Sequence, residues 1–314
     1  STFTSNSTTN TSGAVQNSGM TAEFKNCTFE KNEAGSWGGG AFHTGGTANT
    51  TFTDCQFNEN MAPQGGAISI EAATCTFTRC TFTKNKATKG DRAQESADNP
   101  TKEKAGGAIN IRNDAAVCTL NACTFTSNEA TNGSGGAIVC NKQNAKLNVN
   151  AGTSFNNNTS FFDGAAICID GTLSVNGTSS SKVTFSGNKS LATKSGIANG
   201  GGICLWASGS GKKSVISHVL FTGNEAGQES GSTVNYSNGG GLYISGTAHV
   251  EANDCEFTDN RARNGGGLAY NASTNSTFTD CNFHQNICMS GANKTGTSGN
   301  FNGAATQHGG TGHI

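Results

Sequence analysis

The residues with the most chemical potential in this sequence are the cysteines, which number 12 among 314 residues. Zinc sites use close pairs such as Cys-x-x-Cys, and the sequence contains no such pair. Cysteine also packs well as a small buried hydrophobic residue. We therefore predict a ladder of packed thiols, with disulfides such as Cys168–Cys204 as the alternative. The ladder members each stand two residues before a recurring phenylalanine: Cys27, Cys55, Cys80, Cys123, Cys255 and Cys281.

Acidic side chains offer a second possible chemistry. Asp54, Asp254 and Asp280 stand three residues before the same phenylalanines, and Glu256 and Asp259 lie close by in sequence. Polysaccharide-cleaving enzymes need clustered carboxylates, a calcium site or a basic side chain on one face. The small acidic patch favours a solvated surface or a weak cation site instead. We predict no catalysis, no metal and no cofactor, and a polysaccharide-binding or lyase-like role stays the second alternative.

Two sequence markers alternate along the chain and point to an internal repeat. The first, Phe-x-x-Asn, occurs ten times, from Phe3/Asn6 to Phe283/Asn286. The second, Gly-Gly followed by Ala or Gly and an aliphatic residue, falls between most neighbouring copies of the first. After the first copy, the residues of the first marker are Phe29, Asn32, Phe57, Asn60, Phe82, Asn85, Phe125, Asn128, Phe155, Asn158, Phe185, Asn188, Phe221, Asn224, Phe257, Asn260, Phe283 and Asn286.

The spacing of the markers divides each repeat into a fixed arc and a variable arc. From the first Gly to the next marker Phe the count is 17 to 21 residues, whereas from the marker Asn to the next Gly it is 5 to 21. The fixed arc alternates with period 2, as in "AISIEAATCTFTRCTF", which is typical of strands. Pro63 and Pro100 both fall in the variable arc, where no ladder N–H is required. These features predict an all-β, single-stranded parallel β-helix of about ten rungs.

Stacking in register would place each marker about 4.8 Å above its counterpart. The marker phenylalanines should then form one column inside the solenoid. The marker asparagines should sit at a corner where the chain turns, because asparagine tolerates a left-handed conformation, and they should stack their amides into a ladder. The paired glycines should supply a positive φ or a close backbone approach at the next corner.

The paired GGA(I/L) and FxxN motifs resemble the repeats of chlamydial polymorphic outer membrane proteins and related adhesin-like surface proteins. The resemblance spans residues 1 to 305, which we predict to be one continuous solenoid followed by a flexible Gly/His tail, 306–314. It implies a right-handed parallel β-helix that serves as the exported passenger of a surface adhesin. The resemblance therefore predicts an extracellular or cell-surface location.

The charge and hydropathy of the chain argue against two classes of partner, nucleic acids and membranes. The net charge of −1 provides no basic field for nucleic acid. No apolar run approaches the roughly 20 residues that a membrane-spanning helix needs, so we predict no membrane insertion by this chain.

Two functions fit a chain of this kind. The first is an adhesive display surface for a host cell, the extracellular matrix or a glycan, with the long variable arcs 86–105, 189–199 and 225–238 on one side of the rod. Within the first arc, the charge-dense candidate contact loop contains Lys89, Asp91, Arg92 and Lys102; a solvated insertion is the alternative. The second function is a subunit of an extracellular filament that associates end to end, because the chain begins and stops inside its repeat. A piece of a longer surface protein would look the same.

Overall fold

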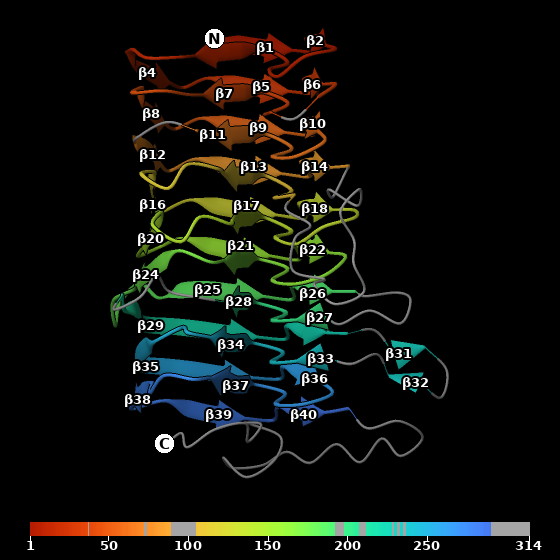
Figure 1. Ribbon diagram of the computed structural model, residues 1–314, viewed down its shortest axis with the longest axis vertical. Coiled ribbons are helices and arrows are strands. Elements are labelled where there is room, and N and C mark those ends of the chain that lie inside the picture. Colours follow the sequence, from red (N-terminus) through yellow and green to blue (C-terminus); the bar gives the residue numbers. More distant parts are fainter. Residues whose placement is uncertain are drawn as a thin grey trace.

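The computed structural model describes residues 1–36, 38–71, 74–88, 105–191, 198–206, 212–227, 229–230, 233–234 and 237–289. Within these residues every regular element is a β-strand and none is a helix. The strands form three long parallel sheets and two small strand pairs. Figure 1 shows the strands stacked in successive rungs, a rung being one turn of the chain around the long axis. The parallel β-helix predicted from the repeat is confirmed.

Each long sheet collects the equivalent strand from successive rungs. The ten-stranded sheet contains β2 (Ser7–Thr8), β6 (Glu33–Ala34), β10 (Met61–Ala62), β14 (Lys86–Ala87), β18 (Glu129–Ala130), β22 (Thr159–Ser160), β26 (Lys189–Ser190), β30 (Glu225–Ala226), β36 (Arg261–Ala262) and β40 (Ile287–Cys288). The nine-stranded sheet contains β3 (Val15–Asn17), β7 (Phe42–Thr44), β11 (Ile68–Ile70), β15 (Ile109–Ile111), β19 (Ile138–Cys140), β23 (Ile167–Ile169), β28 (Ile203–Leu205), β34 (Leu242–Gly246) and β37 (Leu268–Ala272).

The remaining strands form a bent sheet and the two pairs. The bent, 17-stranded sheet contains β1 (Thr2–Thr4), β4 (Thr21–Lys25), β5 (Thr28–Glu30), β8 (Asn49–Thr53), β9 (Gln56–Asn58), β12 (Thr74–Thr78), β13 (Thr81–Thr83), β16 (Val117–Asn121), β17 (Thr124–Thr126), β20 (Lys146–Asn150), β21 (Ser154–Asn156), β24 (Thr172–Asn176), β25 (Val183–Ser186), β29 (Ser214–Thr222), β35 (Val250–Thr258), β38 (Thr277–Thr279) and β39 (Asn282–His284). The pairs are β27 (Ala198–Asn199) with β33 (Ser237–Asn238), parallel, and β31 (Glu229–Ser230) with β32 (Thr233–Val234), antiparallel.

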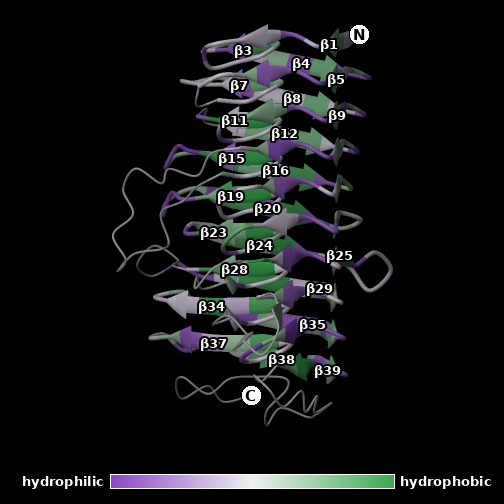
Figure 2. Cartoon of the chain, turned by 90° about the vertical axis from the view of Figure 1, so that its right-hand side faces the viewer, coloured by the Kyte–Doolittle hydropathy of each residue, from purple (hydrophilic) through white to green (hydrophobic). Residues whose placement is uncertain are grey.

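The two views together show the hand of the coil. In Figure 1 the rungs descend from β1 to β40, with β6 and β10 on the right and β8 and β12 on the left. Figure 2 is seen from the right of Figure 1, and it places β7 and β11 toward the front of Figure 1 and β5 and β9 toward its back. Each turn thus passes right, front, left and back as it descends. The solenoid is right-handed.

The core is a stack of like residues on like residues. Neighbouring rungs pair in register, so that Phe82 of β13 stands opposite Phe57 of β9 and Phe125 of β17. From Phe29 to Phe283 the marker phenylalanines are buried, and consecutive rings lie 4.5 to 5.1 Å apart with planes within 13°. The column makes one continuous apolar interior, stabilised by area burial and by ring stacking.

The marker asparagines form an amide ladder along the whole described solenoid, from Asn6 to Asn286, which we call the inner ladder. Each member except Asn286 donates its backbone N–H (2.9 to 3.1 Å) and its Nδ2–H (2.8 to 3.0 Å) to Oδ1 of the next asparagine. From Asn32 on, Nδ2 also donates to the backbone carbonyl of the marker phenylalanine one rung earlier, as Asn158 does to Phe125 at 3.1 Å. The predicted ladder is confirmed, and it pairs the buried amides of successive rungs with one another and with carbonyls of the core.

One detail of the predicted corner was wrong. The left-handed residue is the one before each marker asparagine: Lys31 has φ 53°, Glu59 has φ 53° and Ser127 has φ 56°. None of the marker asparagines from Asn6 to Asn286 has a positive φ. Their backbone N–H and side chain both point along the ladder, so the bend falls on the preceding residue. That residue varies in type because its side chain takes no part in the ladder.

The glycine pair meets both predicted requirements, one at each position. Gly65 has φ 67°, a conformation that favours glycine. Gly66 approaches other backbone so closely that a Cβ atom there would lie 2.1 Å from the carbonyl oxygen of Gly107. The corner between the ten-stranded and nine-stranded sheets is therefore packed backbone against backbone.

Candidate functional site: the arc-bearing edge

The three long variable arcs all leave the solenoid at one edge, which we call the arc-bearing edge. They follow β14, β26 and β30 of the ten-stranded sheet and lead back to β15, β28 and β34 of the nine-stranded sheet. Figure 1 shows the strands from which they start on the right of the molecule. The predicted contact-loop residues Lys89, Asp91, Arg92 and Lys102 lie outside the described residues, as does the segment 306–314.

A second ladder of polar side chains, which the sequence analysis missed, lies where these arcs rejoin the nine-stranded sheet. Asn264 Nδ2 donates to Asn238 Oδ1 at 3.0 Å, and Asn238 Nδ2 donates to Asn199 Oδ1 at 2.7 Å. Asn199 donates both its backbone N–H, at 2.8 Å, and its Nδ2–H, at 3.0 Å, to Asp163 Oδ1. The backbone N–H of Asp163 donates to Ser134 Oγ at 3.2 Å. We call these five residues the outer ladder.

The sequence does carry a signal for the outer ladder. Each of its members directly precedes the first glycine of a glycine marker, as in Asp163-Gly164, Asn199-Gly200 and Asn238-Gly239. An Asx residue fixed relative to a repeated positive-φ glycine stacks on its counterpart for the same reason that the marker asparagines do. The column was hidden because its residue type changes from Ser to Asp to Asn along the chain.

Asp163 is the one acid of the outer ladder, and it is buried with 3% of its surface exposed. Burial raises the pKa of its carboxyl to about 7, while the hydrogen bonds from Asn199 and the nearby Trp206 side chain act in the opposite direction. The nearby Asp170 carboxylate raises the pKa further. At neutral pH the carboxyl is therefore close to half ionised, unlike an ordinary aspartate.

An apolar cluster lies on the outer side of the nine-stranded sheet beside Asp163. The middle residues of successive strands face away from the core yet are buried, as are Val139, Cys168, Cys204 and Tyr243. The Trp206 ring packs edge-on against Tyr243 with centroids 5.7 Å apart. This cluster is a second, smaller core beside the arc-bearing edge.

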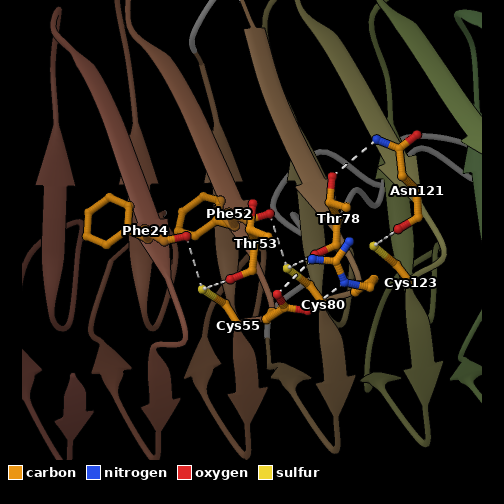
Figure 3. A network of polar contacts seen from close by, with 10 residues as sticks. Phe24, Phe52, Thr53, Cys55, Thr78, Cys80, Asn121 and Cys123 are labelled. Atoms are coloured by element: carbon orange, nitrogen blue, oxygen red, sulfur yellow. Dashed lines mark hydrogen bonds and ion pairs between the residues drawn. The ribbon is translucent and has the colours of Figure 1, made fainter.

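The cysteines are free thiols, so the Cys168–Cys204 disulfide alternative is not formed, although the two residues face each other in register. In the predicted ladder, Figure 3 shows the thiols aimed at backbone carbonyls. Cys55 Sγ donates to the carbonyls of Phe24 and Thr53, both at 3.4 Å, and Cys80 Sγ to that of Phe52 at 3.4 Å. Of the six predicted ladder members, five are buried and Cys281 is partly exposed.

Cys140 also belongs to the main core, although its position drew no prediction. Burial raises the pKa of Cys140 to about 12, and burial likewise raises the pKa of Cys75 and of Cys118. A thiol that stays protonated is a weak nucleophile and a poor metal ligand. These cysteines therefore act as packing residues.

Three of the five acidic residues singled out in the sequence, Asp54, Asp254 and Glu256, contact basic side chains. Arg79 forms a two-bonded contact with Asp54, with Nε–Oδ1 at 2.7 Å and Nη2–Oδ2 at 2.8 Å. This contact lowers the pKa of Asp54. His218 Nδ1 contacts Asp254 on the neighbouring rung, a contact that the sequence analysis missed. Lys182 Nζ lies 3.4 Å from Glu256 Oε2.

The described residues contain no group of three His, Cys, Asp or Glu side chains arranged to hold a metal ion. In the same part of the chain, no helix has the length and apolar character that a membrane crossing requires. Compared with family models, with curated proteins and with solved structures, the chain finds no match.

Proposed function

We propose that this chain is an extracellular structural solenoid that works as an adhesive display surface, without catalysis. The observation that carries the proposal is the arc-bearing edge. All three long arcs depart between the same two sheets, whereas the fixed arcs repeat almost without change in length. A rigid frame with its variation confined to one edge is the arrangement expected of a repeat protein that binds through its insertions.

The dimensions of the edge suit a macromolecular partner. From β14 to β30 the ten-stranded sheet advances by four strands, which corresponds to roughly 19 Å along the axis. The three arcs thus leave the rod close enough to touch one partner together. A contact of this height can bury the area that specific protein interfaces need.

Charge argues for a partner that is recognised by shape and hydrogen bonds. Along the ten-stranded sheet the outward charges neutralise one another: Lys86 Nζ lies 3.2 Å from Glu129 Oε2, and Lys189 Nζ lies 3.6 Å from Glu225 Oε2. With a net charge of −1 the chain has no strong field of either sign. A glycan, matrix protein or host-cell surface fits this surface better than nucleic acid does.

The experiment replaces an arc with the shortest connection that the chain itself uses. In one rung, Ala62-Pro63-Gln64-Gly65 joins the two sheets, so residues 88–105 can be exchanged for Pro-Gln between Ala87 and Gly106. We expect labelled wild-type protein to bind cells, matrix proteins or a glycan array, and arc-replaced protein to bind at least tenfold more weakly. The matched control is Thr83→Ala with Thr126→Ala, on the face away from the arcs. Unchanged binding after all three arcs have been replaced would contradict the proposal.

A filament subunit is the second candidate, and the direction of the inner ladder favours it. Asn6 donates to Asn32, but no described residue donates to Asn6 Oδ1. A further asparagine-bearing rung stacked on β1 and β2, from a second copy or from the same polypeptide, would supply donors to Asn6 Oδ1. Electron microscopy of concentrated protein decides between fibres and single rods about 45 to 50 Å long.

A further inference from the structure

Two of the three long arcs end at residues that are hydrogen-bonded, directly or through one other residue, to the carboxyl group of Asp163. Asn199 closes the arc 189–199, and Asn238 closes the arc 225–238. Asn238 is bonded to Asn199, and Asn199 donates two hydrogen bonds to Asp163 Oδ1. Asp163 is therefore the acceptor at which this chain of amides stops, and the place of both arc ends depends on it.

The surroundings of Asp163 suit a neutral group better than an anion. Cys168 on β23, Cys204 on β28, Tyr243 on β34 and Asp170 just after β23 are the titratable groups that face it. None of these four is a cation. Apart from Asn199 and the Trp206 side chain, which both favour the ionised carboxylate, the carboxyl lies beside the apolar cluster. Burying an ion costs more free energy than burying a neutral acid. Ionisation therefore works against the closed arrangement, by which we mean the state in which Asp163 is buried and bonded to Asn199.

We propose that Asp163 is a proton-controlled anchor for the arcs that end at Asn199 and Asn238. In the protonated form the carboxyl keeps Oδ1 as the acceptor for Asn199 and adds no charge to the cluster. In the ionised form the closed arrangement must hold an anion away from water. The local equilibrium then shifts toward an open state in which Asp163 and Asn199 are hydrated. The proton is the only species bound or released.

The direction of the effect follows from the two pKa values. In the closed state the pKa of Asp163 is about 7, above the ordinary value of 3.8 that it regains when hydrated. The closed state is therefore favoured most below about pH 4 and loses stability as pH rises to about 7, with little further change above that. The anchor does not depend on what the arcs bind. Only its consequence for adhesion rests on the proposed function.

The test is hydrogen exchange at single amides in the folded full chain, between pH 5 and pH 8. The reporters are the backbone N–H of Asn199, which donates to Asp163 Oδ1, and that of Gly135, which donates to the Asp163 carbonyl at 2.9 Å. After correction for the intrinsic exchange rate, we expect their opening constants to rise on the order of 10- to 100-fold over this range. The amide of Asn158 in the inner ladder should show no such rise.

Two variants and one direct titration make the test decisive. Asp163→Asn keeps the acceptor for Asn199 and should abolish the pH response, whereas Asp170→Asn, the same charge change next to the site, should retain it. In the wild type, the side-chain carboxyl ¹³C signal of Asp163 should titrate near pH 7. A midpoint near pH 4, or equal pH responses in wild type and Asp163→Asn, would overturn the anchor. Loss of binding in the arc-replacement experiment has no bearing on either readout, so the two proposals fail separately.

Discussion

The inner and outer ladders both pair polar side chains of successive rungs, but the inner ladder allows only asparagine whereas the outer ladder varies in residue type. In the inner ladder every described rung supplies an asparagine, and from Asn32 to Asn286 each side chain is fully buried. The outer ladder runs from Ser134 through Asp163 to the asparagines, and its last member, Asn264, is only part-buried. Both align polar groups of successive rungs at hydrogen-bonding distance.

The difference shows where this fold can accept change. An inner member receives donors from one neighbouring rung and donates to the other and to a core carbonyl, so an amide is the one side chain that satisfies all of these groups. The outer ladder borders the arcs, and at its beginning Ser134 needs only to accept one bond. The frame, meaning the three long sheets with the phenylalanine column and the inner ladder, therefore repeats the same residues. The outer ladder, at the arc-bearing edge, varies in residue type and includes an ionisable group.

The largest effect should come from placing an acid in the inner ladder. Asn158→Asp turns the donor that serves Phe125 and Asn188 into an acceptor, and it buries a charge without a partner. We expect the free energy of unfolding to fall by about 3–5 kcal/mol at pH 8, and by less at pH 4, where the carboxyl is protonated. Urea unfolding at the two pH values measures this. A loss under about 1 kcal/mol would mean that the two ladders are equally tolerant.

The reverse exchange in the outer ladder should stabilise the protein. Asp163→Asn removes a carboxyl whose pKa in the folded state is about 7, while the acceptor for Asn199 remains. Burial destabilises the ionised carboxylate in the folded state, which is why the pKa is raised. The variant should therefore gain about 2–4 kcal/mol in the free energy of unfolding at pH 8 and close to none at pH 4. The same unfolding experiment measures it. A variant less stable than wild type at pH 8 would show that the carboxylate is a stabilising group.

Shortening an arc should matter little to the frame. Replacement of residues 88–105 by Pro-Gln leaves the strands β14 and β15 and both ladders in place, and it gives this rung the connection that already joins β10 to β11. We expect the free energy of unfolding to change by no more than about 1 kcal/mol. Chemical unfolding of the variant used for the binding assay gives the answer. A loss of several kcal/mol would mean that the arc is part of the frame.

The smallest effect belongs to an exposed pair outside both ladders. Arg79→Ala removes the two contacts to Asp54 at a solvent-exposed corner. The melting temperature should stay the same within error, because exposed ion pairs add little to stability. The pKa of Asp54 should rise toward its ordinary value, since the Arg79 hydrogen bond is the main cause that lowers it. Carboxyl ¹³C titration and thermal unfolding on one sample test both statements.

The sequence predicted the frame because every rung must repeat the same contacts. The ten copies of Phe-x-x-Asn placed the core column and the inner ladder in register, and the glycine marker located the opposite corner. The left-handed residue was assigned one position too late, because asparagine suits both a positive φ and a stacked amide. The residues that do bend, such as Lys31 and Glu59, share no side-chain type.

The chemistry at the edge was harder to predict. The outer ladder changes residue type along the chain, and the ionisation of Asp163 depends on its burial, which appears only in the folded chain. The contact between His218 and Asp254 joins residues 36 positions apart, and it appears only once the register of β29 and β35 is known. Spacing within one repeat does not show which charges of neighbouring rungs meet.

The most direct test of the account is a residue-resolved hydrogen-exchange map of both ladders in the wild-type protein at pH 6.5. If the inner ladder is the frame and the outer ladder anchors the edge, the amides of Asn128, Asn158 and Asn188 should exchange only through global unfolding. Those of Asn199 and Gly135 should exchange through local opening at a distinctly lower free energy. Equal protection of the two ladders, or local opening of the inner ladder first, would contradict the separation of a rigid frame from a responsive edge.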